Sequence, residues 1–492
     1  TTTTTTTTTT TDEAKQNESK AASGDDHSEG KGHYLYSVGA EAADGQIVEY
    51  TIKELEKRKY FKQVPLEKRR YNLFLADRGR INYKKLTLGS HRKIVVNFMR
   101  GMRKITDKTG LVRNLRYHSK STGTDYRTFH PESYIIKARS ANVERDKTDD
   151  DSLNKTDDLN QNKTDDDNQN NEIIVETSKE EDKKSVKENW LEATRRIAKA
   201  KRKDKMRDDR DAFLKAYDEL KGKEGSNAWI AKSTLGYKGL DIKVSDNAQK
   251  LLEFVDKMKG SWVIQKYLED PMLTDGRKFD VRTWHLVTAF GPKKMHMFTY
   301  AEGVLRVSCT RYRNSNFDDE FTHLTNNAIQ QGHPDYGKHE KNNLLDFKDL
   351  DVILSKHYKS LKGVEIKNYP RKDRPMTTEN DILPRINEIV LETLKSIKDW
   401  LLPQPTQAYH LLGYDFMITN TGSVQLIEVN LTPGTSPDRL ARMVSDMAEI
   451  VLDNPFVDPF KMSGSAAADH DLDRKPNSRS SNLFRYSGVV EV

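Results

Sequence analysis

An acidic, low-complexity stretch interrupts the middle of this 492-residue chain. Residues 142–182 contain the unit Lys-Thr-Asp-Asp three times, beginning at Lys147, Lys155 and Lys163. The unit has no apolar face with which to join a core, so we expect an insertion in a loop and not a structural repeat. Any folded domain must therefore be assembled from the sequence on either side of it.

The charge of the chain changes when this insertion is set aside. The insertion holds fifteen acidic and five basic residues, so the formal net charge of +7 becomes +17 for the remainder. A basic remainder predicts a polyanionic partner, which could be a nucleic acid, an acidic membrane surface or an acidic protein tail. Composition does not choose among the three.

Polar composition also separates two tails from the part that can fold. Residues 1–32 begin with eleven threonines and residues 463–492 are rich in serine, so we expect both to be disordered. A single cysteine, Cys309, excludes an internal disulfide framework and indicates a reducing compartment, with the cytosol as the default. The sequence has no signal-peptide core and no run of about 20 apolar residues, which predicts a protein that is neither secreted nor membrane-spanning.

Residues 413–430, GYDFMITNTGSVQLIEVN, have the alternation and the Asn-Thr-Gly punctuation of a β-hairpin. A two-residue Thr-Gly loop would place Asp415 opposite Glu428, with Asn430 on the same face. Two carboxylates about 4 Å apart repel by roughly 4 kcal/mol at an effective dielectric of 20, unless a cation or a shared proton lies between them. Magnesium fits such ligands and keeps positions for phosphates, whereas the alternative is an exposed hairpin with solvated acids.

Residues 276–288, GRKFDVRTWHLVT, read as a strand with charged side chains on one face. The period of two puts Lys278, Asp280, Arg282 and Trp284 on the same side. Such a set can neutralise a phosphate and leave Asp280 to bind a ribose hydroxyl or to orient a lysine. The alternative is a surface ladder of ion pairs.

A loop with two glycines follows the strand that ends in Lys232, within NAWIAKSTLGYKGLDIKV. Glycines let the backbone approach phosphates and a lysine can neutralise them, although this loop has neither the P-loop nor the dinucleotide spacing. A plain hairpin is the alternative. In SWVIQKYLEDPML, a strand leads into a linker whose backbone groups can pair with an adenine edge.

Seven stretches resemble the tubulin–tyrosine ligase family and occur in its order: WIAKS, VIQKYLEDPML, RKFDVRTWHLV, EGVLRVS, FTHLTNNAIQ, LLGYDFM and LIEVNLTPG. The resemblance covers roughly residues 60–137 and 207–457. It includes NLFLADRGRINYKKL and VNFMRGMRKITDKTGLVR, which resemble the N-terminal half of the tyrosine ligase that gives the family its name. We therefore expect that enzyme to be the closest relative.

The resemblance implies an α/β (α+β) ATP-grasp fold with a small basic N-terminal domain, a central domain and a C-terminal domain. The expected parts are a tubulin-contacting domain (33–105), the start of the central domain (106–141), the acidic insertion (142–182), a charged helical segment (183–225) and the catalytic central and C-terminal domains (226–462).

The resemblance also implies roles for individual residues. The ATP-binding set would be Lys108, Lys232, Gln265, Lys266, Leu268, Lys278, Asp280, Thr325 and Asn326. The magnesium ligands would be Asp415, Glu428 and Asn430, and the catalytic set would be Arg282, Arg306 and Glu428. The tubulin-contacting set would be Arg78, Arg80, Arg100 and Lys104. His323, Trp229, Trp262 and Trp284 are expected to be packing residues.

The implied reaction is ATP-dependent amide formation through an acylphosphate, with tyrosine added to the C-terminal glutamate of α-tubulin. Glycylating or glutamylating activity is the alternative, because those relatives share the nucleotide site. The expected partners are tubulin, through its acidic tail, and a free amino acid, for a monomer in the cytoplasm at the cytoskeleton. This favours tubulin over nucleic acid as the partner of residues 60–86, where basic and aromatic residues interleave.

One position departs from the family pattern. Asp241 stands where the glycine loop of the family usually has a second glycine. An acid there could repel phosphate or stiffen the loop, which motivates a second hypothesis, a tubulin-binding protein that has lost turnover.

Overall fold

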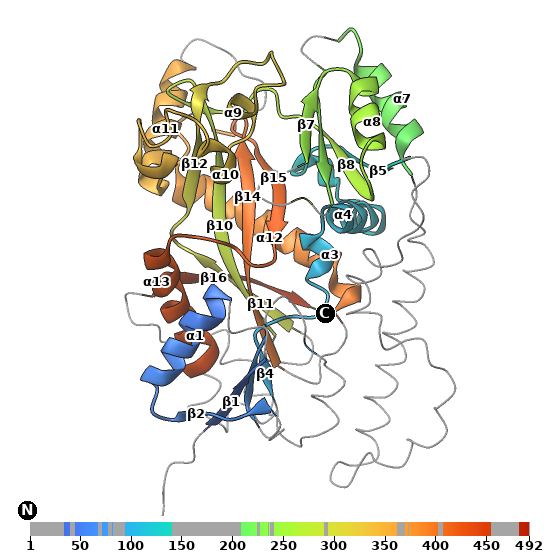
Figure 1. The fold of residues 1–492 in the computed structure, drawn as a ribbon. Helices are drawn as coiled ribbons and strands as arrows, with labels where there is room; N and C mark the ends of the chain where they lie inside the picture. Colours follow the sequence, from blue (N-terminus) through green and yellow to red (C-terminus); the bar gives the residue numbers. More distant parts are fainter. Residues whose placement is uncertain are drawn as a thin grey trace, which may run out of the picture.

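Two β-sheets lie side by side in this protein (Figure 1). The structure is a computed structural model, and it describes residues 34–39, 45–66, 71–76, 81, 94–139, 208–223, 227–234, 236, 241–289, 294–361, 370–371, 373–401, 407–453 and 482–491. The predicted tail 1–32, the insertion 142–182, the segments 183–207 and 463–481, and Arg78 and Arg80 lie outside these residues.

The larger sheet has twelve strands within the described residues, with the central order β13-β12-β10-β14-β4-β3-β1-β2. These strands are β1 (Tyr34–Val38), β2 (Phe61–Gln63), β3 (Leu73–Leu75), β4 (Val95–Val96), β9 (Leu273–Thr274), β10 (Arg277–Ala289), β11 (Lys294–Tyr300), β12 (Val304–Arg311), β13 (Leu344–Leu345), β14 (Gln407–Ile418), β15 (Val424–Asn430) and β16 (Phe484–Glu491). The smaller sheet runs β5-β8-β6-β7, with β5 (Ser133–Lys137), β6 (Trp229–Ser233), β7 (Ile242–Ser245) and β8 (Ser261–Lys266).

Strand β10 is the centre of the larger sheet. It pairs antiparallel with β14 from Val281↔Phe416 to Ala289↔Ala408, and β12 and β11 share its other edge. The predicted alternation is confirmed, because Phe279 and Val281 belong to one hydrophobic cluster and Trp284 to another. The alternative of a surface ladder is wrong, since β10 is buried along its whole length up to its last residue.

The predicted N-terminal domain shares a sheet with the catalytic region. Strands β1 to β4 pair in parallel, and β4 pairs in parallel with β14 at Gln407↔Val95. Helix α1 packs against α13 on the same side (Figure 1). The N-terminal strands are therefore a lateral extension of the larger sheet.

The C-terminal residues correct the prediction of one disordered tail over 463–492. Strand β16 pairs antiparallel with β11 from Lys294↔Glu491 to Tyr300↔Phe484. Phe484 and Val490 are only 2% and 3% exposed, so they complete the core at that edge. The prediction failed because serine-rich sequence upstream concealed a short strand that forms only against a distant partner.

Helices cover the faces of both sheets. The helices are α1 (Gln46–Lys57), α3 (Arg103–Thr106), α4 (Lys108–Thr122), α7 (Arg210–Leu220), α8 (Ala248–Asp256), α9 (Glu320–His323), α10 (Asn327–Gln330), α11 (Phe347–Ser360), α12 (Leu383–Ser396) and α13 (Pro437–Ala448). Shorter helical turns are η2 (Tyr126–Thr128), η3 (Lys341–Asn343), η4 (Thr378–Ile382), η5 (Lys398–Trp400) and η6 (Glu449–Asp453).

Helix α4 joins the two sheets. It contacts β5 and β8 of the smaller sheet and helix α12, whose apolar face packs into the main core of the larger sheet. Its N-terminus is capped by Asp107, which accepts from the Gly110 N–H at 2.8 Å, and this fixes where Lys108 begins the helix. Helices α7 and α8 cover the smaller sheet around Phe213, Trp229 and Trp262.

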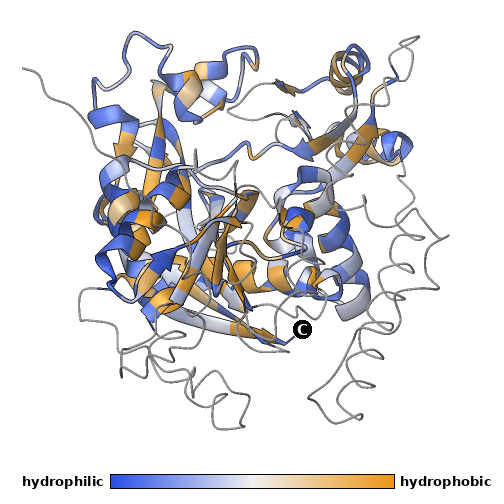
Figure 2. Cartoon of the chain, turned by 60° about the horizontal axis from the view of Figure 1, so that its bottom comes forward, coloured by the Kyte–Doolittle hydropathy of each residue, from blue (hydrophilic) through white to orange (hydrophobic). Residues whose placement is uncertain are grey.

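Hydrophobic residues gather along the strands, and hydrophilic residues cover the outlying helices and loops (Figure 2). Trp229, Trp262 and Trp284 are each 1% exposed or less, which confirms that they are core aromatics. Within the described part of the chain, no helix is both long enough and apolar enough to cross a bilayer.

Replacing Phe484 by alanine tests whether β16 belongs to the folded core. Its ring lies 4.9 Å from that of Tyr300 and is buried, so we expect Phe484→Ala to lower the free energy of unfolding by about 3 to 5 kcal/mol. Val489 lies on the same strand and is 39% exposed, so Val489→Ala is the matched control, with less than about 1 kcal/mol expected. Denaturant unfolding measures both, and equal effects would contradict the packing of β16.

Candidate nucleotide and metal site

The hairpin β14–β15 brings Asp415 directly opposite Glu428, as predicted, but through a different turn. The loop has three residues and not two, because Thr419 pairs with Ser423 and the loop closes with Gly422 at φ +79°. A one-residue β-bulge between Asp415 and Phe416 then restores the predicted register. Asn430 faces Gly413, two residues further along each strand.

Two arginines surround the Asp415 carboxylate. Arg282 donates to both oxygens, through Nε to Oδ1 and through Nη2 to Oδ2 at 2.8 Å. The Nη2 of Arg306 lies 2.9 Å from Oδ2. Burial alone would raise the pKa of Asp415, but the two guanidinium groups outweigh it and hold that pKa well below its usual range.

Arg306 also binds Asp280, on the neighbouring strand. Its Nε donates to Asp280 Oδ1 at 2.9 Å, and its Nη2 pairs with Oδ2. The guanidinium group therefore lies between two buried carboxylates. Arginine therefore compensates the charge of Asp415, which is one of the two acids of the hairpin.

Two buried lysines come from different sheets. Lys232, at the end of β6, donates to Gln265 Oε1 at 2.7 Å, and Lys278 of β10 donates to the Tyr267 hydroxyl at 2.8 Å and to the His323 carbonyl at 2.9 Å. Burial lowers the pKa of Lys232 to about 8 and that of Lys278 to about 7. The charge of Lys232 lowers the pKa of Lys278 further.

Lys108 connects the hairpin to the glycine loop. Its Nζ donates to the Gly236 carbonyl at 3.1 Å and lies 3.6 Å from Glu428 Oε2. Glu428 and Lys108 both act on the pKa of Lys232, so these three charges lie within electrostatic reach of one another. The cluster thus combines five cations with Asp280, Asp415 and Glu428, and its net positive charge suits a polyphosphate.

Sequence comparison identifies the family to which this arrangement belongs. A sequence model of the tubulin-tyrosine ligase family matches residues 158–464, well over half of the chain. The chain belongs to the tubulin-tyrosine ligase family. This confirms the predicted family and, with the two sheets described above, the predicted α/β fold of the ATP-grasp type.

Curated relatives show which branches of the family the chain resembles. Tubulin glycylase 3C of Tetrahymena thermophila is 31% identical over 234 residues, which is 46% of this chain and 20% of the relative. Probable tubulin polyglutamylase ttll-9 of Caenorhabditis elegans is 30% identical over 221 residues, 44% of this chain and 48% of the relative. Human protein monoglycylase TTLL8 is 27% identical over 264 residues, 49% of this chain and 29% of the relative. The chain thus spans between about a fifth and a half of the length of these relatives.

These relatives support the family but not the expected closeness to the tyrosine ligase. Their names are those of glycylases and a polyglutamylase, which matches the alternative activity stated from the sequence. The resemblance of the N-terminal residues 60–137 to the tyrosine ligase led to the finer expectation. The reported relatives align with 44–49% of this chain.

Two of the predicted nucleotide residues, Lys266 and Asn326, make local contacts outside the cluster. The Nζ of Lys266 donates to the Ala228 carbonyl at 2.9 Å and pairs with Glu269, because adjacent residues of β8 face opposite sides. The Asn326 side chain caps α10 by accepting from Ala328 N–H at 3.0 Å. Thr325 is buried and Leu268 half-buried beside these elements. Their nucleotide-binding roles stay predictions.

The predicted tubulin contacts are only partly described. Arg100 is half-buried before α3, and the Lys104 Nζ lies 4.2 Å from the centre of the Trp400 ring. That cation–π contact fixes Lys104 against η5. The other two, Arg78 and Arg80, lie outside the described residues, so the tubulin-contacting set stays a prediction.

Sequence reasoning missed the residues that hold Lys278. His323, expected to be a packing residue, places its Nδ1 2.9 Å from the Tyr267 hydroxyl and offers its carbonyl to Lys278. The Tyr267 ring also lies 4.4 Å from the Lys278 Nζ. Both residues stand in stretches that carried the family resemblance, but nothing in their local pattern indicated a contact with Lys278.

Asp241 has a backbone reason for its position. It lies at φ +57°, in the left-handed region that glycine adopts freely, and its carbonyl accepts from Ser233 N–H at 3.2 Å. Aspartate tolerates this region better than most residues do. The acid therefore meets the conformational demand that glycine usually meets there.

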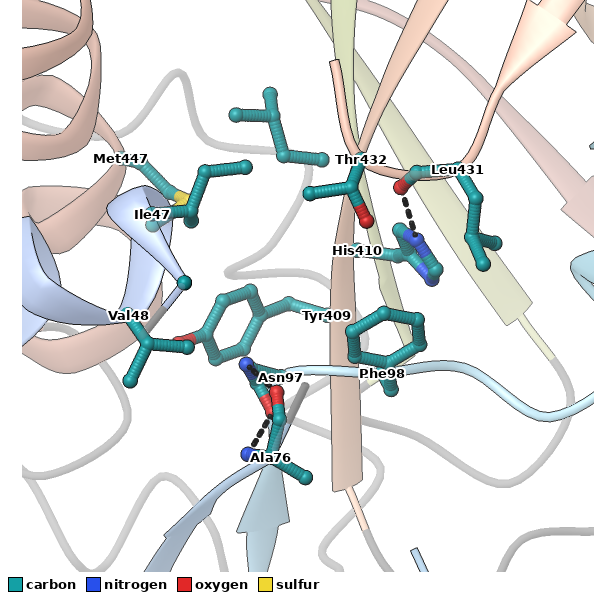
Figure 3. Close-up of a pocket in the computed structure, with 12 residues that line it drawn as sticks. Ile47, Val48, Ala76, Asn97, Phe98, Tyr409, His410, Leu431, Thr432 and Met447 are labelled. Atoms are coloured by element: carbon teal, nitrogen blue, oxygen red, sulfur yellow. Dashed lines mark hydrogen bonds between the residues drawn. The ribbon is translucent and has the colours of Figure 1, made fainter. Parts of the chain in front are cut away.

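A small pocket lies apart from the cluster, between helices α1 and α13 and strand β14 (Figure 3). None of the predicted site residues lines it, and its cavity volume of about 30 Å³ has room for water and not for a nucleotide. His410 at its wall accepts from Met99 N–H at 3.3 Å and donates to the Leu431 carbonyl at 3.0 Å. It anchors the loop that follows Asn430.

The donor set fits magnesium carried by a nucleotide. Within the described residues, no three His, Cys, Asp or Glu side chains form a metal site by themselves. Asp415, Glu428 and Asn430 converge as two carboxylates and an amide, which leaves ligands to be supplied by phosphates and water. These three residues would hold the ion.

The pH dependence of nucleotide binding tests the two lysines. A polyanion favours their charged form, so binding at pH 8 should take up about one proton, and affinity should fall as pH rises from 6.5 to 9. Calorimetry in buffers of different ionisation enthalpy measures the uptake. Lys278→Arg, which stays protonated, should reduce it, and binding without proton uptake would contradict the lowered pKa values.

The same lysines predict the sign of stability against pH without nucleotide. Their folded-state pKa values lie below the ordinary value of 10.5, so the unfolded chain binds more protons between about pH 7 and 10.5. Their contribution to the free energy of unfolding should therefore rise with pH through that window. Lys278→Met should remove part of this slope in denaturant titrations, and an unchanged slope would count against it.

Substitution of Asp241 separates its backbone from its charge. Asp241→Asn keeps a side chain that tolerates positive φ, so we expect stability within about 0.5 kcal/mol of the wild type, whereas Asp241→Ala should cost about 1 kcal/mol. Thermal unfolding measures both. A nucleotide affinity raised more than a few-fold in Asp241→Asn would show that the acid does repel phosphate.

Proposed function

We propose that this protein is an ATP-dependent ligase that attaches glycine or glutamate to a glutamate side chain in the acidic tail of tubulin. The observation that carries the proposal is the convergence of Lys108, Lys232, Lys278, Arg282 and Arg306 around three carboxylates at the meeting of two sheets. The family and the names of the relatives supply the substrate class.

In the proposed reaction, a tail carboxylate attacks the γ-phosphate of ATP and releases ADP, which gives an acylphosphate. The amine of the free amino acid then attacks the acyl carbon, phosphate leaves, and the nitrogen loses a proton. The lysines would bind and orient the phosphates, and the arginines would face the carboxylates. Magnesium, held by Asp415, Glu428 and Asn430, would neutralise phosphate charge.

The choice of amino acid rests on the relatives. Glycine and glutamate are favoured over tyrosine because the relatives are named glycylases and a polyglutamylase. Tyrosine, expected from the N-terminal stretches, is kept as an arm of the experiment. The partners proposed are tubulin and a free amino acid, for a monomer that acts in the cytoplasm at the cytoskeleton.

The second hypothesis, a tubulin-binding protein without turnover, loses its main support. It was motivated by Asp241, which stands where the family usually has glycine. The positive φ of this residue is a conformation that aspartate tolerates, so the exchange has a backbone explanation. The buried cations of the cluster also remain, and surface binding alone gives no reason to keep lysines whose burial costs free energy.

Parallel incubation with labelled glycine, glutamate and tyrosine, ATP, magnesium and tubulin tests the proposal. We expect labelling with glycine or glutamate, and Glu428→Gln should lower it at least a hundred-fold because the site loses a negative charge that helps to hold magnesium beside the phosphates of ATP. Glu388→Gln, on the surface and 64% exposed, is the matched control and should keep full activity. No transfer of any of the three would overturn the proposed function.

A further inference from the structure

Donors crowd the buried Asp415 carboxylate, most of them at Oδ2. A carboxylate offers about four lone-pair sites. Arg282 donates one bond to each oxygen, whereas Arg306 Nη2 at 2.9 Å and Asn430 Nδ2 at 3.3 Å both reach Oδ2, so one acceptor site remains on Oδ1. Asp415 is also only 1% exposed, so water does not compete. A divalent cation that binds Oδ1 would lie beside the Nε of Arg282, so the two positive charges would compete for this carboxylate.

The two arginines differ in what they would lose. Arg306 keeps Asp280 as a second partner, through Nε at 2.9 Å and Nη2. Arg282 contacts no carboxylate other than Asp415 among the residues that the structure describes. Arg282 is also 8% exposed, so it would be left as a buried cation without a counterion.

We propose that Asp415 is an exchange point that sets the order of substrate binding. This inference rests on the proposed function. Binding of magnesium with the nucleotide breaks the ion pair between Arg282 and Asp415. The released guanidinium group then binds a carboxylate of the second substrate. Without the metal, Arg282 is occupied by Asp415 and the carboxylate site does not exist.

The exchange couples two ligands, and coupling of binding is reciprocal. Carboxylate binding should be at least ten-fold tighter when magnesium and nucleotide are bound, and magnesium–nucleotide binding should tighten equally when the carboxylate is present. The carboxylate could come from the free amino acid or from the acceptor tail. Each source needs its own probe.

Calorimetry on the wild-type chain is the first test. Glycine, L-glutamate and an acetylated, C-terminally amidated tetraglutamate peptide are each titrated with and without magnesium and a non-hydrolysable ATP analogue. We expect at least one probe to bind ten-fold more tightly with the analogue, and the identity of that probe shows which substrate Arg282 receives. Equal affinity of every probe in both conditions would overturn the inference.

Arg282→Lys is the second test, because it keeps the charge and removes the fork that holds both Asp415 oxygens. Magnesium–analogue binding should become at least three-fold tighter, since the metal no longer displaces a bidentate pair, and the coupling should shrink. The matched control is Arg277→Lys, since Arg277 lies on the same strand in a buried forked pair with Glu340, at 2.7 and 2.8 Å. It should leave both affinities unchanged.

The outcomes separate the inference from the proposed function. Magnesium–analogue binding in Arg282→Lys that is no tighter than in the wild type would overturn the exchange and leave the ligase proposal intact. A wild-type chain that binds no magnesium–analogue complex would overturn the proposed function. The wild-type titrations remain decisive if Arg282→Lys does not fold.

Discussion

The antiparallel pairing of β10 with β14 is the constraint on which the site depends. It places Arg282 directly across from Asp415 in a buried ladder, and β12 on the other edge brings Arg306 beside Asp280. Because the two strands are paired from Val281↔Phe416 to Ala289↔Ala408, the backbone holds these charged side chains next to one another. Their charges are therefore balanced by one another until a ligand enters.

The sequence predicted those parts of the site whose spacing is local. The period of two in β10 was sufficient to place Lys278, Asp280 and Arg282 on one face, and the hairpin placed Asp415 opposite Glu428. The hairpin register was obtained through two errors that cancel, a loop one residue too short and a missed β-bulge. Bulges depend on packing against neighbouring strands, which local alternation does not encode.

Other features could not be predicted, because they arise from contacts between distant segments. Nothing near Lys278 in the sequence indicates that Tyr267 and His323 hold its ammonium group. The pairing of β4 with β14 and of β16 with β11 likewise joins strands that lie far apart in the sequence. Strands this short contain too few residues to show an alternating pattern. Whether they form therefore depends on the neighbouring strand with which they pair.

The backbone at Asp241 bears on how inactive members of such a family are recognised. From the sequence alone, the absence of a glycine at this position motivated the hypothesis of a protein without turnover. At a position with φ +57°, however, glycine, asparagine and aspartate can all adopt the backbone conformation that residue 241 has. A survey that sorts relatives by glycine alone would discard chains whose five cations are all in place.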